Sequence, residues 1–335
     1  MPIHSPPHRS ARLIQGLALC FTGLIAAPAL AAPYAYITNQ ASHDVSIVDG
    51  KSLREVGRVT VGRSPAGIAV SAARGLAFIS NTGSESVSVI DLASQGTVAT
   101  LPIHGTPVGI AAAPDGKRLY VADWYANRLQ VFDTADYHRL DNIAVGRVPA
   151  GIALTPDGAT VFVANRDDDN LSVIDSTSLQ VSTTIQTGRH PFALGVDPSG
   201  RHLLALNVES NDVTVIDITS RRPLATLAVG RAPYGVAFDL GGKRAFVTNQ
   251  HDASLSVIDL EALKVETTWP TADYPEGIAY EAVGDGGRLW VVSWMEDCIQ
   301  VLDSTAGKPL ARIPVGSNPR AFGTFLANPG SGAKQ

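Results

Sequence analysis

The feature that most constrains the fold of this chain is an internal repeat of 42 residues, with a last step of 44. Three columns of residues recur in one register. One holds Pro65, Pro107, Pro149, Pro191, Pro233, Pro275 and Pro319, and a second holds Asp49, Asp91, Asp133, Asp175, Asp217, Asp259 and Asp303. Ten residues before each aspartate stand Asn39, Asn81, Asp123, Asn165, Asn207, Asn249 and Ser293. The shared spacing indicates seven copies of one structural unit.

Each unit has the pattern of four short β-strands. In one copy these are residues 150–154, 160–165, 171–175 and 181–186, which are rich in β-branched side chains and separated by Gly, Pro, Asn and Asp. Four antiparallel strands in about 42 residues are typical of a propeller blade. The sequence therefore predicts an all-β fold, a seven-bladed β-propeller of four-stranded antiparallel blades.

The register also predicts how the ring closes. The propeller, expected over residues 32–326, begins at the second strand of a blade, residues 35–39, and ends with an unpaired first strand, residues 321–326. We expect this last strand to complete the N-terminal blade as its inner strand, because an open ring would leave apolar blade faces in water. Residues 327–335 are expected to form a flexible tail.

The N-terminal 31 residues have the pattern of a signal peptide. Arg9 and Arg12 precede an apolar run, residues 13–30, and Ala29-Leu30-Ala31 is a small-x-small cleavage signature. We expect a cut after Ala31 and a periplasmic or secreted protein with no membrane span in the mature chain. A membrane anchor is the alternative, and the shortness of the run and its interruption by Gly and Pro argue against it.

Charge and cysteine content narrow the function classes further. Removal of residues 1–31 leaves 24 basic and 31 acidic residues, a net charge of −7, which argues against bulk nucleic-acid binding. Cys298 would be the one cysteine left, so no intramolecular disulfide is expected, and the sequence has no CxxCH haem motif. We predict no cofactor and expect a monomer.

The recurring strings YITN, FISN, FVAN and FVTN, together with VSIVD, VSVID and LSVID, resemble the YVTN family of β-propeller repeats. The resemblance covers residues 34–326 and implies a seven-bladed propeller. It implies little about function, because wider propeller relatives include binding scaffolds, lactonases, lyases and cofactor-bearing oxidoreductases.

One acidic stretch, Asp167 to Asp169, raises the question of a calcium site. A calcium loop needs alternating ligands, a glycine and a distal glutamate, whereas these aspartates are consecutive. The same loop recurs in the other blades with free composition. We therefore interpret the stretch as an acidic turn rather than a metal site.

Candidate site residues lie in the loops at one rim of the propeller. The inner strands carry small and aliphatic columns without titratable side chains, which argues against chemistry in the middle of the channel. Two residues before the prolines stand Arg63, Arg147, Arg189 and Arg231. The adjoining loops contribute His190, Phe192, Tyr234, Tyr274, Glu276, Arg320, Trp124, Arg166 and Trp294.

This rim supports two interpretations. Arginines and aromatic rings could bind an anionic small molecule or protein partner at the channel mouth. Alternatively, the arginines could pair with acids of neighbouring blades as a structural belt. We predict a non-enzymatic, exported scaffold or ligand-binding propeller. The alternatives are a metal-dependent lactonase or lyase-type hydrolase, with Glu276, Asp273 and the Asn column as ligands, and an accessory protein of a quinone- or haem-dependent oxidoreductase.

Overall fold

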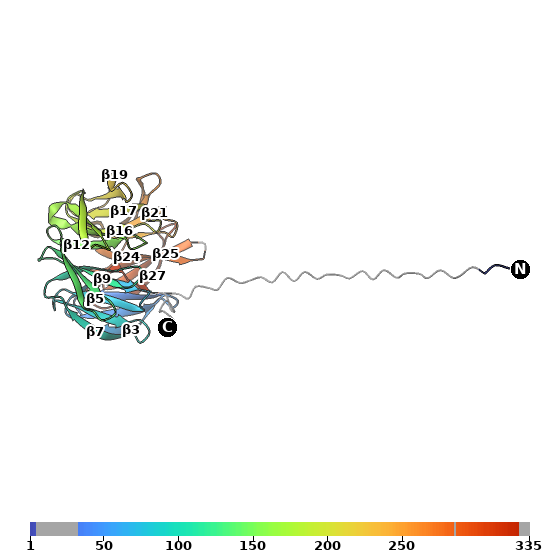
Figure 1. Cartoon of the computed structure of the whole chain (residues 1–335), viewed down its shortest axis with the longest axis horizontal. Helices are drawn as coiled ribbons and strands as arrows, with labels where there is room; N and C mark the ends of the chain where they lie inside the picture. The colour runs from blue at the N-terminus through green and yellow to red at the C-terminus, as the bar shows by residue number, and fades with distance from the viewer. Residues whose placement is uncertain (5–32, 285, 328–335) are drawn as a thin grey trace. The chain divides into compact units, whose positions relative to one another are not determined.

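The computed structural model describes residues 1–4, 33–284 and 286–327, and the chain divides into two units, residues 1–31 and 32–335 (Figure 1). Of the first unit only residues 1–4 are described, and they are exposed and have no regular structure. The remainder of the predicted signal peptide and its cleavage site lie outside the described residues. Nowhere in the described part of the chain is there a helix with the length and apolar character that a membrane crossing requires.

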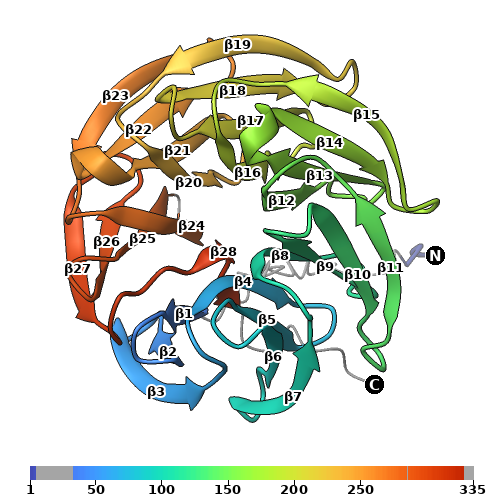
Figure 2. The same ribbon diagram turned by 90° about the vertical axis from the view of Figure 1, so that its left-hand side faces the viewer.

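The second unit is the predicted seven-bladed propeller, in which seven sheets surround one axis and the strands within each blade are antiparallel (Figure 2). The inner strands are β4 (Pro65–Ser71), β8 (Pro107–Ala112), β12 (Pro149–Leu154), β16 (Pro191–Val196), β20 (Pro233–Phe238) and β24 (Pro275–Val283). The second strands are β1 (Tyr34–Asn39), β5 (Leu76–Asn81), β9 (Arg118–Asp123), β13 (Thr160–Asn165), β17 (His202–Asn207), β21 (Arg244–Asn249) and β25 (Gly286–Ser293). Each inner strand of this set begins at a proline of the repeat, which lacks a backbone donor for the ladder.

The outer half of each blade is formed by the third and fourth strands. The third strands are β2 (Asp44–Asp49), β6 (Ser86–Asp91), β10 (Arg128–Asp133), β14 (Asn170–Asp175), β18 (Asp212–Asp217), β22 (Ser254–Asp259) and β26 (Cys298–Asp303). The fourth strands are β3 (Arg54–Thr60), β7 (Gly96–Pro102), β11 (Arg139–Ala144), β15 (Gln180–Gln186), β19 (Arg222–Ala228), β23 (Lys264–Pro270) and β27 (Pro309–Pro314). Two short 3-10 helices, η1 (Arg166–Asp168) and η2 (Gln250–Asp252), lie in loops between second and third strands.

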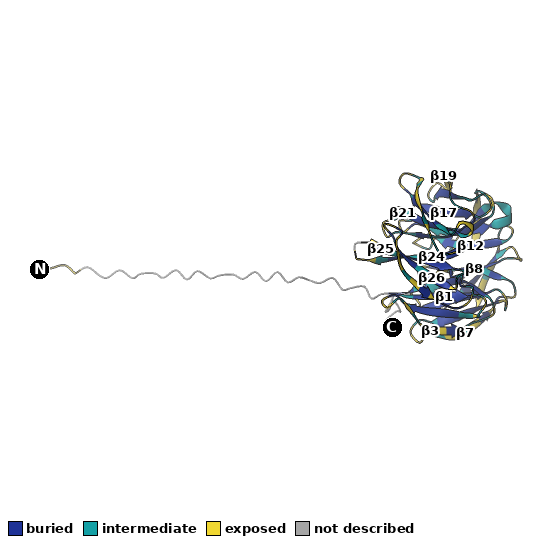
Figure 3. Cartoon of the chain, turned by 180° about the vertical axis from the view of Figure 1, so that it is seen from behind, coloured by how far each residue is buried: buried dark blue, intermediate teal, exposed yellow. Residues whose placement is uncertain are grey.

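Burial follows position within the blade (Figure 3). In β13 five of six residues are buried, whereas in β15 only Ile185 is. The middle strands are covered on both faces by neighbouring blades, so both of their faces are apolar, and the outer strands face solvent. The hydrophobic core is therefore a ring of interblade layers rather than one central core.

The predicted closure of the ring, by pairing of a C-terminal strand with the N-terminal blade, is confirmed. Strand β29 (Leu326–Ala327) pairs antiparallel with β1, with Ala327 opposite Tyr34, and completes the sheet β29-β1-β2-β3. The pairing is shorter than predicted, because β28 (Phe322–Thr324) instead runs parallel to β4 of the next blade. In Figure 2 this segment lies beside β4. Ala327, which we expected in the tail, belongs to a strand, and residues 328–335 lie outside the described part.

Crowding around the axis explains the small residues of the inner strands. A Cβ atom on Gly109 would lie 1.8 Å from the carbonyl oxygen of Ala150 in the next blade. A hydroxyl group on the second strand β21 also joins neighbouring inner strands, because Oγ1 of Thr248 accepts the backbone N–H of Gly235 at 2.8 Å and donates to the carbonyl oxygen of Glu276 at 2.9 Å. These close contacts hold the residues that follow the prolines in a fixed position at the channel mouth.

Candidate functional site

The rim arginines lie against acids of the next blade. Nε of Arg147 donates to Oδ1 of Asp168 at 2.6 Å, and the backbone N–H of Arg147 donates to Oδ2 of the same carboxylate at 2.7 Å. Arg231 and Asp252 repeat this arrangement. About two-thirds of each arginine side chain remains exposed, 66% for Arg147 and 68% for Arg231. These arginines hold adjacent loops together.

Arg189 and Arg63 show how the arrangement varies between blades. Nη1 of Arg189 lies 3.7 Å from Oε1 of Glu209. The other oxygen of this carboxylate, Oε2, lies 2.9 Å from Nδ1 of His190. Arg63 belongs to none of the ion pairs among the described residues and lines a groove of about 380 Å³ together with Glu85. Counter-charges thus accompany three of the four rim arginines, as the structural-belt interpretation of these residues expects. We call Arg147, Arg189 and Arg231 the arginine belt.

The acidic stretch is used by the turn itself. Asp167 pairs with Arg166 at 2.5 Å, Asp168 pairs with Arg147, and Oδ1 of Asp169 accepts the backbone N–H of His190 at 2.8 Å. Asp169 has a φ of 52°, a left-handed conformation that aspartate tolerates. Each carboxylate therefore has a structural partner within the rim.

The residues that directly follow the prolines form the centre of the mouth. Phe192, Tyr234, Glu276 and Arg320 occupy this one repeat position in successive blades, and Phe322 lies against them. The ring centroids of Phe192 and Tyr234 are 4.7 Å apart, and those of Phe192 and Phe322 are 5.0 Å apart. We call Phe192, Tyr234, Glu276, Arg320 and Phe322 the mouth cluster.

Arg320 connects the polar side of the mouth cluster. Its Nη1 donates to the Tyr234 hydroxyl at 3.0 Å and to Oε2 of Glu276 at 3.3 Å, and its Nε donates to Oε1 of Gln40 at 2.9 Å. Oε1 of Glu276 accepts from Gln250 at 2.7 Å. None of the hydrogen bonds among the described residues uses Nη2 of Arg320, and 22% of that side chain is exposed. One edge of the guanidinium therefore remains available.

Burial controls the electrostatics of this cluster. Glu276 is fully buried, and loss of solvation raises its pKa to about 7 against the opposing effects of Arg320 and Gln250. Burial also raises the pKa of Tyr234, which therefore remains a neutral hydrogen-bonding group near neutral pH. Since Glu276 is about half protonated near pH 7, Arg320 retains uncompensated positive charge there.

Aromatic rings extend the mouth cluster outward in two arms. The guanidinium carbon of Arg320 lies 5.5 Å from the ring centroid of Trp294, whose ring contacts Tyr274 with centroids 5.9 Å apart. On the other side, Arg166 lies 5.9 Å from the Trp124 ring, which meets Phe192 edge-on at 6.0 Å. The structure thus brings together Tyr234, Tyr274, Glu276, Arg320, Trp124, Arg166 and Trp294, whereas His190 stays with the arginine belt.

Gln40, Gln250 and Phe322 also belong to the mouth, and the sequence interpretation missed them. Gln40 and Gln250 directly follow the Asn column, at the repeat position that Trp124, Arg166 and Trp294 occupy in other blades. This column and the one after the prolines vary in residue type among the blades, although their neighbours hardly vary. Variation at a fixed repeat position is the signal that could have found Gln40 and Gln250.

The proposed metal ligands do not converge. Glu276 is held by Gln250 and Arg320, and the Nδ2 atom of Asn249 donates to Ser254 and Ser256 within its own blade. Among the described residues, no three His, Cys, Asp or Glu side chains gather as a metal site would require. The donor set at the mouth therefore does not fit the divalent ion of a metal-dependent lactonase.

Comparison with known proteins finds two β-propeller family models, each of which matches part of the chain. The family model for YNCE-like β-propellers matches residues 38–160, and the model for lactonases with a seven-bladed β-propeller matches residues 141–229. Together with the seven blades, these matches fit a YVTN-type β-propeller protein. No curated protein matches the sequence.

Two solved structures resemble this YVTN-type propeller in fold. A chain of hydrazine synthase from Kuenenia stuttgartiensis has a TM-score of 0.72 at 21% identity and covers 85% of this chain and 99% of that chain. A functionally unknown protein from Desulfotomaculum acetoxidans DSM 771 has a TM-score of 0.75 at 12% identity, with coverage of 88% and 99%. At these identities the likeness concerns the fold alone.

Proposed function

We propose that this YVTN-type propeller is an exported, non-enzymatic binding protein that takes an anionic small molecule at its mouth cluster. The observation that carries the proposal is the setting of Arg320. Its guanidinium stacks near Trp294, has one edge without a described hydrogen bond, and faces a counter-charge that is half protonated near pH 7. A carboxylate or phosphate is the group that complements such a guanidinium.

The aromatic arms favour a ligand with a flat body. Trp294, Tyr274 and His251 follow one another outward from Arg320, with Tyr274 5.6 Å from His251 between ring centroids. Aromatic faces stack on planar groups and bind cations and rings at modest energetic gain. A planar carboxylate would place its charge on Arg320 and its ring against Trp294.

Protonation of Glu276 is expected to control the affinity. An ionised Glu276 competes with the ligand for Arg320, and a protonated one does not. Anion binding should therefore strengthen as the pH falls through about 7, the pKa of Glu276.

The direct test is calorimetric titration of the protein with benzoate and with inorganic phosphate, at pH 6 and pH 8. We expect benzoate to bind at pH 6 and Arg320→Gln to weaken it at least tenfold. Arg231→Gln is the matched control, because Arg231 belongs to the arginine belt and is 68% exposed. Equal loss in both variants, or unchanged binding by Arg320→Gln, would place the anion elsewhere and refute the proposal.

Export is the second part of the proposal, and it rests on the sequence of residues 1–31. The Ala29-Leu30-Ala31 signature predicts that the exported chain begins at Ala32. N-terminal sequencing of protein recovered from the periplasm or the medium tests this. A recovered chain that retains residues 13–30 would contradict it.

The lactonase family match over residues 141–229 favours lactone hydrolysis as a second candidate function. Glu276, with a pKa of about 7, is the mouth residue suited to proton transfer near neutral pH. A panel of lactones with and without added divalent cation, compared with Glu276→Gln, would decide it. Turnover that Glu276→Gln abolishes would replace the non-enzymatic proposal.

A further inference from the structure

The central channel contains a cavity of about 590 Å³ on the far side of the mouth cluster. Its wall is formed by β8, β12, β16, β20, β24 and the C-terminal segment at residues 322–326. Strand β28 covers the inner edge of β4 by parallel pairing, which explains why β4 does not contribute to this wall. The volume falls within the range of pockets that hold small organic molecules.

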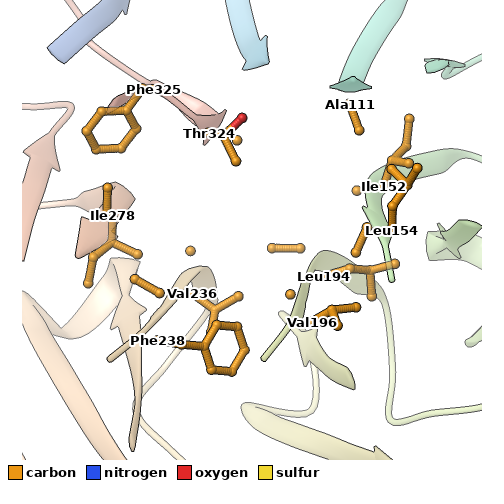
Figure 4. Close-up of a pocket in the computed structure, with 18 of the residues that line it drawn as sticks. Ala111, Ile152, Leu154, Leu194, Val196, Val236, Phe238, Ile278, Thr324 and Phe325 are labelled. Carbon is orange, nitrogen blue, oxygen red and sulfur yellow. The ribbon is translucent and has the colours of Figure 1, made fainter. Parts of the chain in front are cut away.

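The wall is mainly hydrocarbon. Figure 4 shows side chains from different blades facing the cavity, and Thr324 is the one labelled residue that carries a polar side-chain atom. The labelled aliphatic and aromatic residues are Ala111, Ile152, Leu154, Leu194, Val196, Val236, Phe238, Ile278 and Phe325. Leu194, Val196 and Val236 are only partly buried, although they lie on inner strands. Apolar cavities of this kind bind apolar molecules readily.

Polar groups near the wall already have partners. Oγ1 of Thr324 accepts the backbone N–H of Val70 at 3.2 Å. The buried carboxylate of Asp197 lies 3.0 Å from Nδ1 of His202 and accepts from Ser199 and the backbone N–H of Arg201. Neither group therefore requires a charged or strongly polar ligand.

The mouth cluster closes one end of this cavity. Phe192, Tyr234 and Phe322 are each at most 9% exposed and their rings contact one another across the axis. Phe322 lines the cavity as well. At the other end the lining reaches Pro114, Pro156 and Pro198, in the turns that follow β8, β12 and β16. A ligand would therefore enter from the face opposite the mouth cluster.

We infer that the central channel is a second binding site, separate from the mouth, which takes one neutral apolar molecule through the face of the Pro114, Pro156 and Pro198 turns. The aliphatic wall supplies the binding energy by removing apolar surface from water. Open backbone edges of the inner strands supply a few polar contacts that orient the ligand.

Fluorescence titration with N-phenyl-1-naphthylamine, a neutral apolar probe that brightens out of water, tests the inference. We expect saturable binding of one probe per chain. Leu194→Trp fills the cavity and should weaken binding at least tenfold, whereas Leu224→Trp, on the exposed strand β19, should leave it unchanged. Absence of binding to the unaltered protein, or equal affinity for Leu194→Trp, overturns the inference.

A further variant keeps the test decisive if Leu194→Trp does not fold. Val236→Thr keeps the side-chain shape but adds a hydroxyl to the wall, and it should weaken probe binding several-fold at the same stoichiometry. Unchanged affinity in that variant would overturn the inference.

Discussion

Nη1 of Arg320 lies 3.3 Å from Oε2 of Glu276, and this contact joins the C-terminal segment to the inner strand of the preceding blade. The backbone N–H of Arg320 donates to the carbonyl oxygen of Thr38 at 2.9 Å, which is part of the ring closure. One residue therefore belongs both to the closure of the propeller and to its candidate binding site. Changes at the mouth are expected to affect stability as well as binding.

Stability should depend on the ionisation of Glu276. Burial raises its pKa from 4.5 to about 7, so the folded chain holds this proton more tightly than the unfolded chain does. The contribution of Glu276 to the free energy of unfolding is therefore fully present below pH 4.5, and it is lost as the pH rises through about 7. At ~1.4 kcal/mol per pKa unit, the loss across that range is about 3 kcal/mol. Urea unfolding of the unaltered protein and of Glu276→Gln at pH 4.5, 6 and 8 measures it, and the variant should lack this slope.

Glu296 provides a matched control with the opposite sign. A hydrogen bond from the backbone of Asp273, and then the Arg312 side chain, lower the pKa of Glu296. Its contribution is therefore present above the unfolded pKa and is lost as the pH falls through the folded value. Glu296→Gln should leave the slope between pH 4.5 and 7 intact. The same slope in the Glu276→Gln protein as in the unaltered one would show that Glu276 is not the responsible group.

The fold could be predicted from the sequence because the same residue types recur at the same positions in seven repeats. The proline that starts β12 and the aspartate that ends β14 recur in every blade, so chance matches are excluded by repetition. The course of the last segment could not be predicted in the same way. Ala321 has a φ of 49° and Gly323 a φ of 125°, and these turns direct β28 toward β4. No other blade has an equivalent from which to infer them.

The carboxylates that pair with the arginine belt should contribute more to the stability of the fold than the arginines themselves do. Asp252 accepts the backbone N–H of Arg231 as well as its side chain. Exposed ion pairs contribute ~0–1 kcal/mol, and the hydrogen bond to the backbone of Arg231, which only the loss of Asp252 removes, contributes a further ~0.5–1.5 kcal/mol. Thermal or urea unfolding should show a smaller loss for Arg231→Ala than for Asp252→Ala.

Serine offers an internal rescue for this prediction. Ser84 and Ser210 occupy the position of Asp252 in other blades and accept the backbone N–H of Arg63 and Arg189. Asp252→Ser should therefore recover most of the stability that Asp252→Ala loses, even though it carries no charge. A serine variant as unstable as the alanine variant would show that the charge is what matters.

The candidate site was only partly predictable, because its geometry depends on packing across blades. The variety of rim residues indicated Tyr234, Glu276 and Arg320 as candidates. Whether a rim arginine meets a ligand or an acid depends on which loop lies against it, and the acid at Asp168 lies 21 residues from Arg147 in sequence. The sequence alone therefore left the two interpretations open.

Gly109 should tolerate no side chain. An added Cβ would lie 1.8 Å from the carbonyl oxygen of Ala150, which is fixed backbone, so the two blades would have to separate. Overpacking of this kind typically costs ~1–3 kcal/mol or more. Gly57→Ala is the control, because its Cβ would meet only Ile47 at 3.8 Å. Urea unfolding should show a large loss for Gly109→Ala and almost none for Gly57→Ala.

Ring closure should depend on residues 319–327 and not on those that follow. Phe325 is fully buried against the core of the first blade, and its carbonyl oxygen accepts the backbone N–H of Tyr36 at 2.9 Å. Phe325→Ala should cost ~3–5 kcal/mol, as for other buried phenylalanines. Deletion of residues 319–335 should cost at least as much, since it also removes β28 and β29. Deletion of residues 328–335 alone is the control, because it leaves every described strand pair of the closure, up to Ala327, in place. Unfolding free energies that match the unaltered protein after the longer deletion would rule out this closure.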